Sequence, residues 1–132
     1  MSEAAVAPEA LKVPQQVRRA VDLLLDRKAT DVVVLDLDRL SSATDWFVIA
    51  TGRSDTHVTA IADNLIGELK NEGVRPVNVE GLRGGRWVLV DYFDFVVHVF
   101  HPAAREFYQL ERLWGDAPQH HVAPEESGSP AS

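Results

Sequence analysis

Two neighbouring segments constrain the fold most, because each of them is apolar on both of its faces. Residues 86–92 and 95–100 each alternate between two sets of side chains, and most members of both sets are hydrophobic. Residues 92–94 leave a gap of hairpin length between the two segments. Successive side chains of a strand point to opposite sides of a sheet, so this pair predicts a sheet that helices cover on both faces.

The spacing of apolar residues elsewhere predicts three more strands and three helices. The helices are expected to begin at Pro14, at Ser54 or Asp55, and at Pro102, all of which are favoured at helix starts. Their expected core stripes are Val17, Val21, Leu24 and Leu25, then Val58, Ile61, Leu65, Ile66 and Leu69, then Phe107, Leu110 and Trp114. The further strands are expected at residues 31–37, 46–51 and 77–80. The order α-β-β-α-β-β-β-α predicts an α/β (α+β) fold with a mixed five-stranded sheet and helices packed on both faces.

Length and composition point to one domain with a tail at each end. A chain of 132 residues, 45% of them hydrophobic, is sized for a single core. We expect the domain at residues 13–115 and disordered tails at 1–12 and 116–132, because periodic apolar residues are missing there. The chain has no cysteine, no visible signal peptide, and no apolar run near the ~20 residues that cross a bilayer. We therefore expect a cytoplasmic protein without a membrane partner.

The charge distribution favours a basic protein partner over a nucleic acid. The formal charge is −7, and residues 14–114 carry 15 acidic and 12 basic side chains. The expected fold is therefore mildly acidic, and it lacks the cluster of Lys and Arg that phosphate contacts require. Complementary charge favours association with a basic protein surface. We expect little or no direct contact with nucleic acid.

Catalysis has little support in the sequence, and we expect no enzyme activity, no cofactor and no metal. The chain has no cysteine nucleophile and no G-x-S-x-G motif. His98 and His101 are three residues apart and would point to opposite faces of a strand, so they do not form a metal site. His98 lies among valines and is expected to be a hydrogen-bonded core or interface histidine.

One alternative is a nucleotide-binding or nucleotidyltransferase-type enzyme. Residues 52–55, from Gly52 to Asp55, join a strand end to a helix start, where backbone N–H groups can hold an anion. Asp36 and Asp38 form a D-x-D pair that could hold a divalent metal. Transferases, however, place the glycine-serine turn before the paired acids, and here the acids come first. The competing interpretation is an ordinary helix cap and the polar end of a strand.

Several segments in a fixed order resemble the Iojap family, the ribosomal silencing factors. The resemblance covers roughly residues 14–116 and is carried by residues 31–36, 42–49, 51–54 with 57, 80–81, 86–92, 94–100 and 105–114. It implies a fold similar to nucleotidyltransferases without a transferase role, and a homodimer when the protein is free. It also implies binding to ribosomal protein uL14 on the large ribosomal subunit. Bound there, the protein would sterically block association with the small subunit and repress translation under nutrient limitation.

The same resemblance assigns partner binding to Trp87 and Tyr108. Tyr108 lies one residue off the expected core stripe, so it should be at least half exposed, and Glu111 should share its helix face. An exposed aromatic side chain beside an acid is typical of an anchor for a basic surface. The competing interpretations are a tyrosine at the core margin, a solvated Glu111, and Trp87 as a partly buried core residue. Asp91 and Asp94 are secondary candidates, because turn chemistry alone accounts for them.

The hairpin departs from the family pattern at one position. The family usually has glycine between Tyr92 and Asp94, where this chain has Phe93. Glycine tolerates a positive φ at little cost and phenylalanine does not, so either the turn type differs or Phe93 carries strain. The ring at the tip is also a candidate for self-contact in a dimer.

Overall fold

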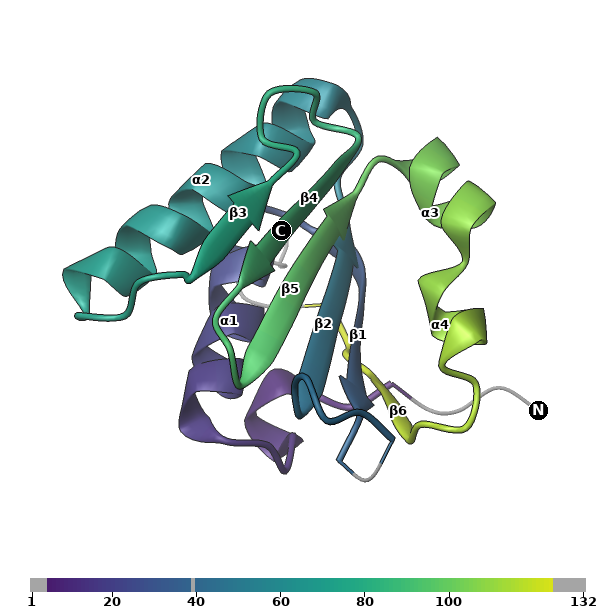
Figure 1. The fold of residues 1–132 in the computed structure, drawn as a ribbon. Coiled ribbons are helices and arrows are strands. Elements are labelled where there is room, and N and C mark those ends of the chain that lie inside the picture. Colours follow the sequence, from purple (N-terminus) through teal and green to yellow (C-terminus); the bar gives the residue numbers. More distant parts are fainter. Residues whose placement is uncertain (1–4, 39, 125–132) are drawn as a thin grey trace, which may run out of the picture.

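A six-stranded mixed sheet lies at the centre of the fold, and helices pack on both of its faces (Figure 1). The computed structural model describes residues 5–38 and 40–124. Its elements in chain order are the 3-10 helix η1 (Pro8–Ala10), α1 (Gln15–Asp26), β1 (Thr30–Asp36), β2 (Trp46–Thr51), α2 (Asp55–Asn71), β3 (Asn78–Glu80), β4 (Trp87–Asp91), β5 (Phe95–Phe100), α3 (Pro102–Tyr108), α4 (Leu110–Leu113) and β6 (Gln119–His121). The strand order is β3-β4-β5-β2-β1-β6; β2 and β5 pair in parallel, and the other neighbouring pairs are antiparallel. The predicted α/β class is confirmed.

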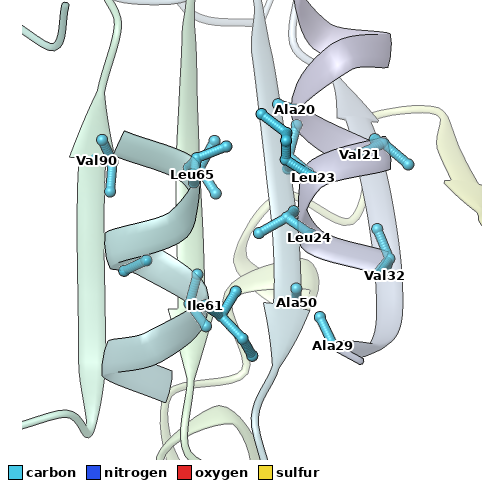
Figure 2. Close-up of a cluster of buried hydrophobic side chains, with 14 of the residues drawn as sticks. Ala20, Val21, Leu23, Leu24, Ala29, Val32, Ala50, Ile61, Leu65 and Val90 are labelled. Atoms are coloured by element: carbon cyan, nitrogen blue, oxygen red, sulfur yellow. The ribbon is translucent and has the colours of Figure 1, made fainter. Parts of the chain in front are cut away.

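The larger core lies between one face of the sheet and the pair α1 and α2. The apolar side chains predicted at helical spacing in α1 and α2 are buried there, among them Leu24, Ile61 and Leu65, except Ile66, which is partly buried. Figure 2 shows these side chains gathered between the two helices and the strands behind them, with Ala50 and Val90 contributed by the sheet. Full burial of an aliphatic side chain of this size contributes about 1.5–3 kcal/mol, so this face supplies most of the hydrophobic stabilisation.

The second face carries a smaller core, which α3 and α4 cover. Here the predicted single helix after Pro102 is interrupted, because Gln109 adopts a left-handed conformation with φ 47°. Residues before and after this break no longer share one helical face. Leu110 is buried as expected, but the prediction that Phe107 is a core residue is wrong, since its side chain is 77% exposed.

The sheet has six strands where five were predicted, because the segment after residue 115 returns to its edge. β6 pairs antiparallel with β1, and the N–H of Val122 donates to the carbonyl oxygen of Val32 at 2.9 Å. Val6 near the N-terminus forms a bridge with Val122. The structure therefore differs from the predicted disordered tails at residues 5–12 and 116–124; residues 1–4 and 125–132 lie outside the described residues. A three-residue edge strand offers too few positions for a periodic signal.

Short-range sequence signals predicted the other boundaries of helices and strands well. The strands at 46–51 and 95–100 and the helix start at Pro102 are confirmed as predicted. Ser54 is the N-cap of α2, and its Oγ accepts a hydrogen bond from the N–H of His57 at 3.1 Å. Within the described part of the chain, none of the helices combines the length and apolar character needed to cross a membrane.

Candidate functional site

Trp87 and Tyr108, the two residues predicted to bind a partner, lie against each other. Trp87 opens β4 and pairs in register with Phe100, the last residue of β5, after which α3 carries the chain back past the indole. The ring centroids of Trp87 and Tyr108 are 4.7 Å apart. Tyr108 is 47% exposed, close to the predicted half, and the exposed ring of Phe107 contacts it edge-on at 5.0 Å. We call Trp87, Phe107 and Tyr108 the aromatic surface.

The indole of Trp87 packs against the smaller core, on the second face of the sheet. It stacks on Phe100 at a centroid distance of 5.0 Å, and its Nε1–H donates to Nδ1 of His98 at 3.1 Å. His98 is 3% exposed, and burial lowers its pKa to about 3, so the ring is neutral and can accept this bond. The prediction of a hydrogen-bonded core histidine is confirmed. Trp87 itself is half-buried, so it belongs to the core margin as well as to the surface.

Glu111 forms an internal ion pair. Its Oε2 accepts hydrogen bonds from Nε and Nη2 of Arg105 at 3.1 and 2.6 Å. Nη1 of Arg105 donates to the carbonyl oxygen of Asp31 at 2.5 Å and to Oγ1 of Thr51 at 2.8 Å. The prediction that Glu111 shares one helix face with Tyr108 is wrong, because the break at Gln109 separates them. The charge of Glu111 is compensated within the molecule.

The Arg105 network missed by the sequence analysis is what holds α3 in place. Ala104 is the only buried residue in the seven-residue helix, so apolar burial contributes little to its position. Its start is capped by His101, whose Nδ1 accepts from the N–H of Ala103 at 3.2 Å. Further along, Arg105 ties the helix to β1, β2 and α4. The location of Tyr108 therefore depends on Arg105. Because Arg105 and Glu111 are six residues apart across a helix break, no helical spacing signals the pair.

Asp91 is the last residue of β4 and Asp94 lies in the turn that follows, so both are at the opposite end of β4 from Trp87. Asp91 is four residue positions along the strand from Trp87, a distance of roughly 13 Å. Asp91 Oδ1 accepts from the N–H of Phe93 at 2.8 Å, which is turn chemistry. Phe93 has φ 75° and is 67% exposed, so it carries the strain that the missing glycine would avoid.

Comparison with known proteins identifies the family. A protein-family model described as "Ribosomal silencing factor during starvation" matches residues 10–132. The chain belongs to the ribosomal silencing factor family. The ribosomal silencing factor of Bacillus subtilis is 45% identical over 93 residues, which are 70% of this chain and 79% of the relative. A crystal structure of a protein from Chromobacterium violaceum is 37% identical with a TM-score of 0.76, covering 92% of this chain and 100% of that one.

A mouse relative extends the comparison to animals. It is called "Mitochondrial assembly of ribosomal large subunit protein 1" and is 35% identical over 97 residues. The match takes in 71% of this chain but 42% of the mouse protein, which is thus much longer. The resemblance inferred from the sequence segments is confirmed at the level of the family.

The sheet register separates the two halves of the alternative nucleotide site in this ribosomal silencing factor. Asp36 pairs with Trp46 at one end of β2, whereas Thr51, which precedes Gly52, pairs with Thr30 at the other end. The two ends are five residue positions apart along the strand, a distance of roughly 17 Å. Asp36 and Gly52 therefore cannot contact one nucleotide phosphate together. Asp36 instead accepts from the N–H of Asp38 at 3.0 Å, which is typical of a strand end.

Three N–H groups of the turn at the start of α2 are already hydrogen-bonded within the protein. The N–H of Gly52 donates to the carbonyl oxygen of Phe100 at 2.9 Å, and that of Arg53 donates to Nδ1 of His57 at 2.8 Å. The N–H of His57 donates to Ser54, the helix cap. Groups that are already paired cannot cradle an anion without first breaking these bonds. The geometry favours the helix-cap interpretation.

The surface beside this turn is also unfavourable for phosphate. A hollow of about 390 Å³ is lined by Asp55 and Asp63 together with Arg83. Two carboxylates against one guanidinium repel an anion more than they attract it. Within residues 5–38 and 40–124, no group of three or more His, Asp or Glu side chains is arranged to hold a metal ion.

Proposed function

We propose that this ribosomal silencing factor binds ribosomal protein uL14 on the large ribosomal subunit and sterically blocks association with the small subunit. In this way it represses translation under nutrient limitation. The observation that carries the proposal is the pairing of Trp87 and Tyr108, whose rings meet at 4.7 Å in an exposed aromatic surface. Two elements far apart in the chain are needed to build it.

The names of relatives support a ribosomal target. The family description refers to silencing of ribosomes during starvation, and the name of the mouse relative refers to assembly of the large ribosomal subunit. Both names are consistent with a protein whose partner is the large subunit. A ribosomal function also suits the cytoplasmic location that we propose for this chain.

The aromatic surface has the chemistry of a protein-binding anchor. Aromatic side chains dominate the energetics of protein interfaces, and Tyr108 adds a polar hydroxyl, whereas the Nε1–H of Trp87 is donated inward to His98. The chain carries a net charge of −7, which favours approach to a basic ribosomal protein. Glu111 would contribute to this negative electrostatic potential mainly at long range, because it already forms an ion pair with Arg105. Asp91 and Asp94 would form a distant acidic margin of the same face.

Blocking of subunit association requires no chemical step. A ligand that binds only the free large subunit stabilises that subunit by RT ln(1 + [L]/Kd) and so opposes joining in proportion to its occupancy. The bulk of the protein, held on the face that meets the small subunit, supplies the steric conflict. The proposed function therefore includes no catalysis and no cofactor.

Sedimentation with separated ribosomal subunits tests the proposal. The wild type should sediment with large subunits and not with small ones, and in a joining assay it should lower the yield of intact ribosomes. Tyr108→Ala should weaken binding by roughly 30-fold, as expected for loss of an interface hot spot. Leu40→Ala is the control, because it truncates a side chain of comparable exposure, 43%, in the loop between β1 and β2, away from Trp87 and Tyr108. Normal joining with the protein in saturating excess would refute the proposed function.

We also propose that the free protein is a homodimer. Large apolar side chains exposed in the described residues, among them Phe93, Phe107 and Leu113, offer surface for self-contact. Light scattering at several protein concentrations measures the molar mass directly. A molar mass near the 14.6 kDa of one chain at every concentration would contradict the dimer.

A further inference from the structure

His98 is a polar side chain in a strand that is otherwise built for a core. All six residues of β5 are buried, and the other five are phenylalanine or valine. A buried polar group destabilises a fold by about 1–3 kcal/mol unless a hydrogen bond compensates for its lost hydration. A valine or leucine would avoid this penalty, so the presence of histidine calls for a specific partner.

That partner is the indole of Trp87. Nδ1 of His98 accepts the Nε1–H of Trp87 at 3.1 Å, while Nε2 is buried and has no hydrogen-bond partner among the described residues. Because Nδ1 accepts, the imidazole carries its proton on Nε2. The imidazole therefore has no hydrogen bond at Nε2, while its Nδ1 accepts one from Trp87.

The packing around His98 leaves the imidazole little freedom. The ring of Phe47 meets it edge-on at a centroid distance of 4.5 Å, and Phe100 stacks parallel to it at 6.2 Å. Burial also lowers the pKa of His98 to about 3, so the acceptor nitrogen stays unprotonated at neutral pH. The acceptor is therefore fixed in place and always available.

The aromatic contacts of the indole, in contrast, involve its faces and do not determine the direction in which its Nε1–H points. Phe100 stacks on the indole and Tyr108 packs at 4.7 Å, but neither ring contact involves its Nε1–H; the other χ2 rotamer turns the indole by about 180° about the Cβ–Cγ bond. A flipped indole would point Nε1–H away from His98 and leave it partly buried without an acceptor. The hydrogen bond selects one of the two ring orientations.

We propose that His98 is a positioning residue for docking: by accepting the Nε1–H of Trp87, it fixes the indole in the orientation that supports Tyr108. This inference rests on the proposed function, because it assigns His98 a role in the same aromatic surface. His98 itself is buried and does not touch the partner. Its contribution acts entirely through Trp87.

A matched pair of substitutions at His98 tests the role of its hydrogen-bond acceptor. His98→Asn keeps an oxygen near the place of Nδ1, whereas His98→Leu has the same branching and no polar atom. The stability of each variant is measured separately, because leucine removes a buried polar group that asparagine keeps, and binding is compared under conditions in which both variants are folded. His98→Leu should speed solvent exchange of the Trp87 indole proton and bind large subunits roughly five- to tenfold more weakly than His98→Asn. In a Trp87→Phe background, which lacks the donor, the two substitutions should bind alike.

Two results would overturn the inference. One is equal indole exchange and equal binding in the Asn and Leu variants; the other is a difference between them that persists with Trp87→Phe. If neither variant folds, ¹⁵N NMR of the wild type decides, since a proton on Nδ1 of His98 would exclude the hydrogen bond and one on Nε2 would support it. Failure of the wild type to bind large subunits would instead refute the proposed function, while the NMR measurements would still decide what orients Trp87.

Discussion

Replacing Glu111 by glutamine should weaken the attachment of α3 without removing any apolar contact. Both hydrogen bonds from Arg105 end on the same oxygen, Oε2, at 2.6 and 3.1 Å. A glutamine can keep a carbonyl oxygen at that place, so Glu111→Gln removes the charge and leaves the geometry. The expected effect is therefore the difference between a charged and a neutral acceptor.

Arg105 stays charged, so both hydrogen bonds remain charge-assisted and the substitution removes the ion-pair attraction. That loss lies between the ~0.2–1 kcal/mol of an exposed ion pair and the ~3–5 kcal/mol for breaking a buried one. The side chains of Arg105 and Glu111 are 13% and 26% exposed, and water screens the pair to that extent. We expect the free energy of unfolding to fall by about 1–2 kcal/mol and the melting temperature by roughly 3–8 °C.

Urea unfolding of two matched variants measures this effect. Glu106→Gln makes the same chemical change in α3, at the residue after Arg105. The side chain of Glu106 is exposed and forms no ion pair in the described residues. It should leave the unfolding midpoint nearly unchanged. Glu111→Gln should also bind large subunits more weakly, because Tyr108 is attached through Arg105. Equal midpoints for Glu106→Gln and Glu111→Gln would refute the reasoning.

Three further perturbations test other parts of the structure. Phe93→Gly should raise the free energy of unfolding by about 1 kcal/mol, because φ 75° strains any residue with a Cβ; Phe93→Ala should show no such gain, and equal values would contradict the strain. Burial lowers the pKa of His98 to about 3, whereas an unfolded histidine titrates near 6.5, so below pH 6.5 the unfolded state binds a proton that the folded state excludes. Stability from this group should be complete above pH 6.5 and fall by up to about 1.4 kcal/mol per pH unit between pH 6.5 and 5; an equally steep fall in His98→Leu would exclude His98 as the cause. Gly52→Ala should destabilise by about 1–3 kcal/mol, because a Cβ would lie 2.9–3.1 Å from atoms of Val58. Gly67→Ala, exposed in α2 with nothing within 4 Å, should instead stabilise by about 0.5–1 kcal/mol; a shared direction of change in thermal unfolding would refute the packing argument.

Predictions from the sequence succeeded wherever a few adjacent residues carry the whole cause. The cap at Ser54 needs one hydroxyl and the N–H three residues on, and Pro102 fixes the start of α3 through its own ring. The valine-rich strand 95–100 is buried on both faces because both of its alternating sets are apolar. For these elements the sequence contains the physical reason in full.

Predictions failed where the cause is a contact between distant segments. β6 exists because β1 offers it an edge, and nothing within three residues of β6 reveals that edge. The break at Gln109 is equally non-local, since glutamine has no preference for φ 47° and the conformation is maintained by packing on either side of it. Because the helix breaks between Phe107 and Leu110, the two residues no longer share the predicted stripe: Leu110 is buried and Phe107 is exposed.

The same distinction separates residues that touch a partner from residues that hold them. Tyr108 and Glu111 lie close in sequence, and loss of either should weaken docking, so binding data alone would assign both to the interface. Glu111 is paired with Arg105, which in turn holds Asp31 and Thr51, so its loss must also lower the stability of the free protein. Tyr108 is 47% exposed, so its truncation should weaken docking with a much smaller loss of stability. Measuring unfolding and docking on the same variants therefore distinguishes a contact from its support, which no substitution scan of binding can do.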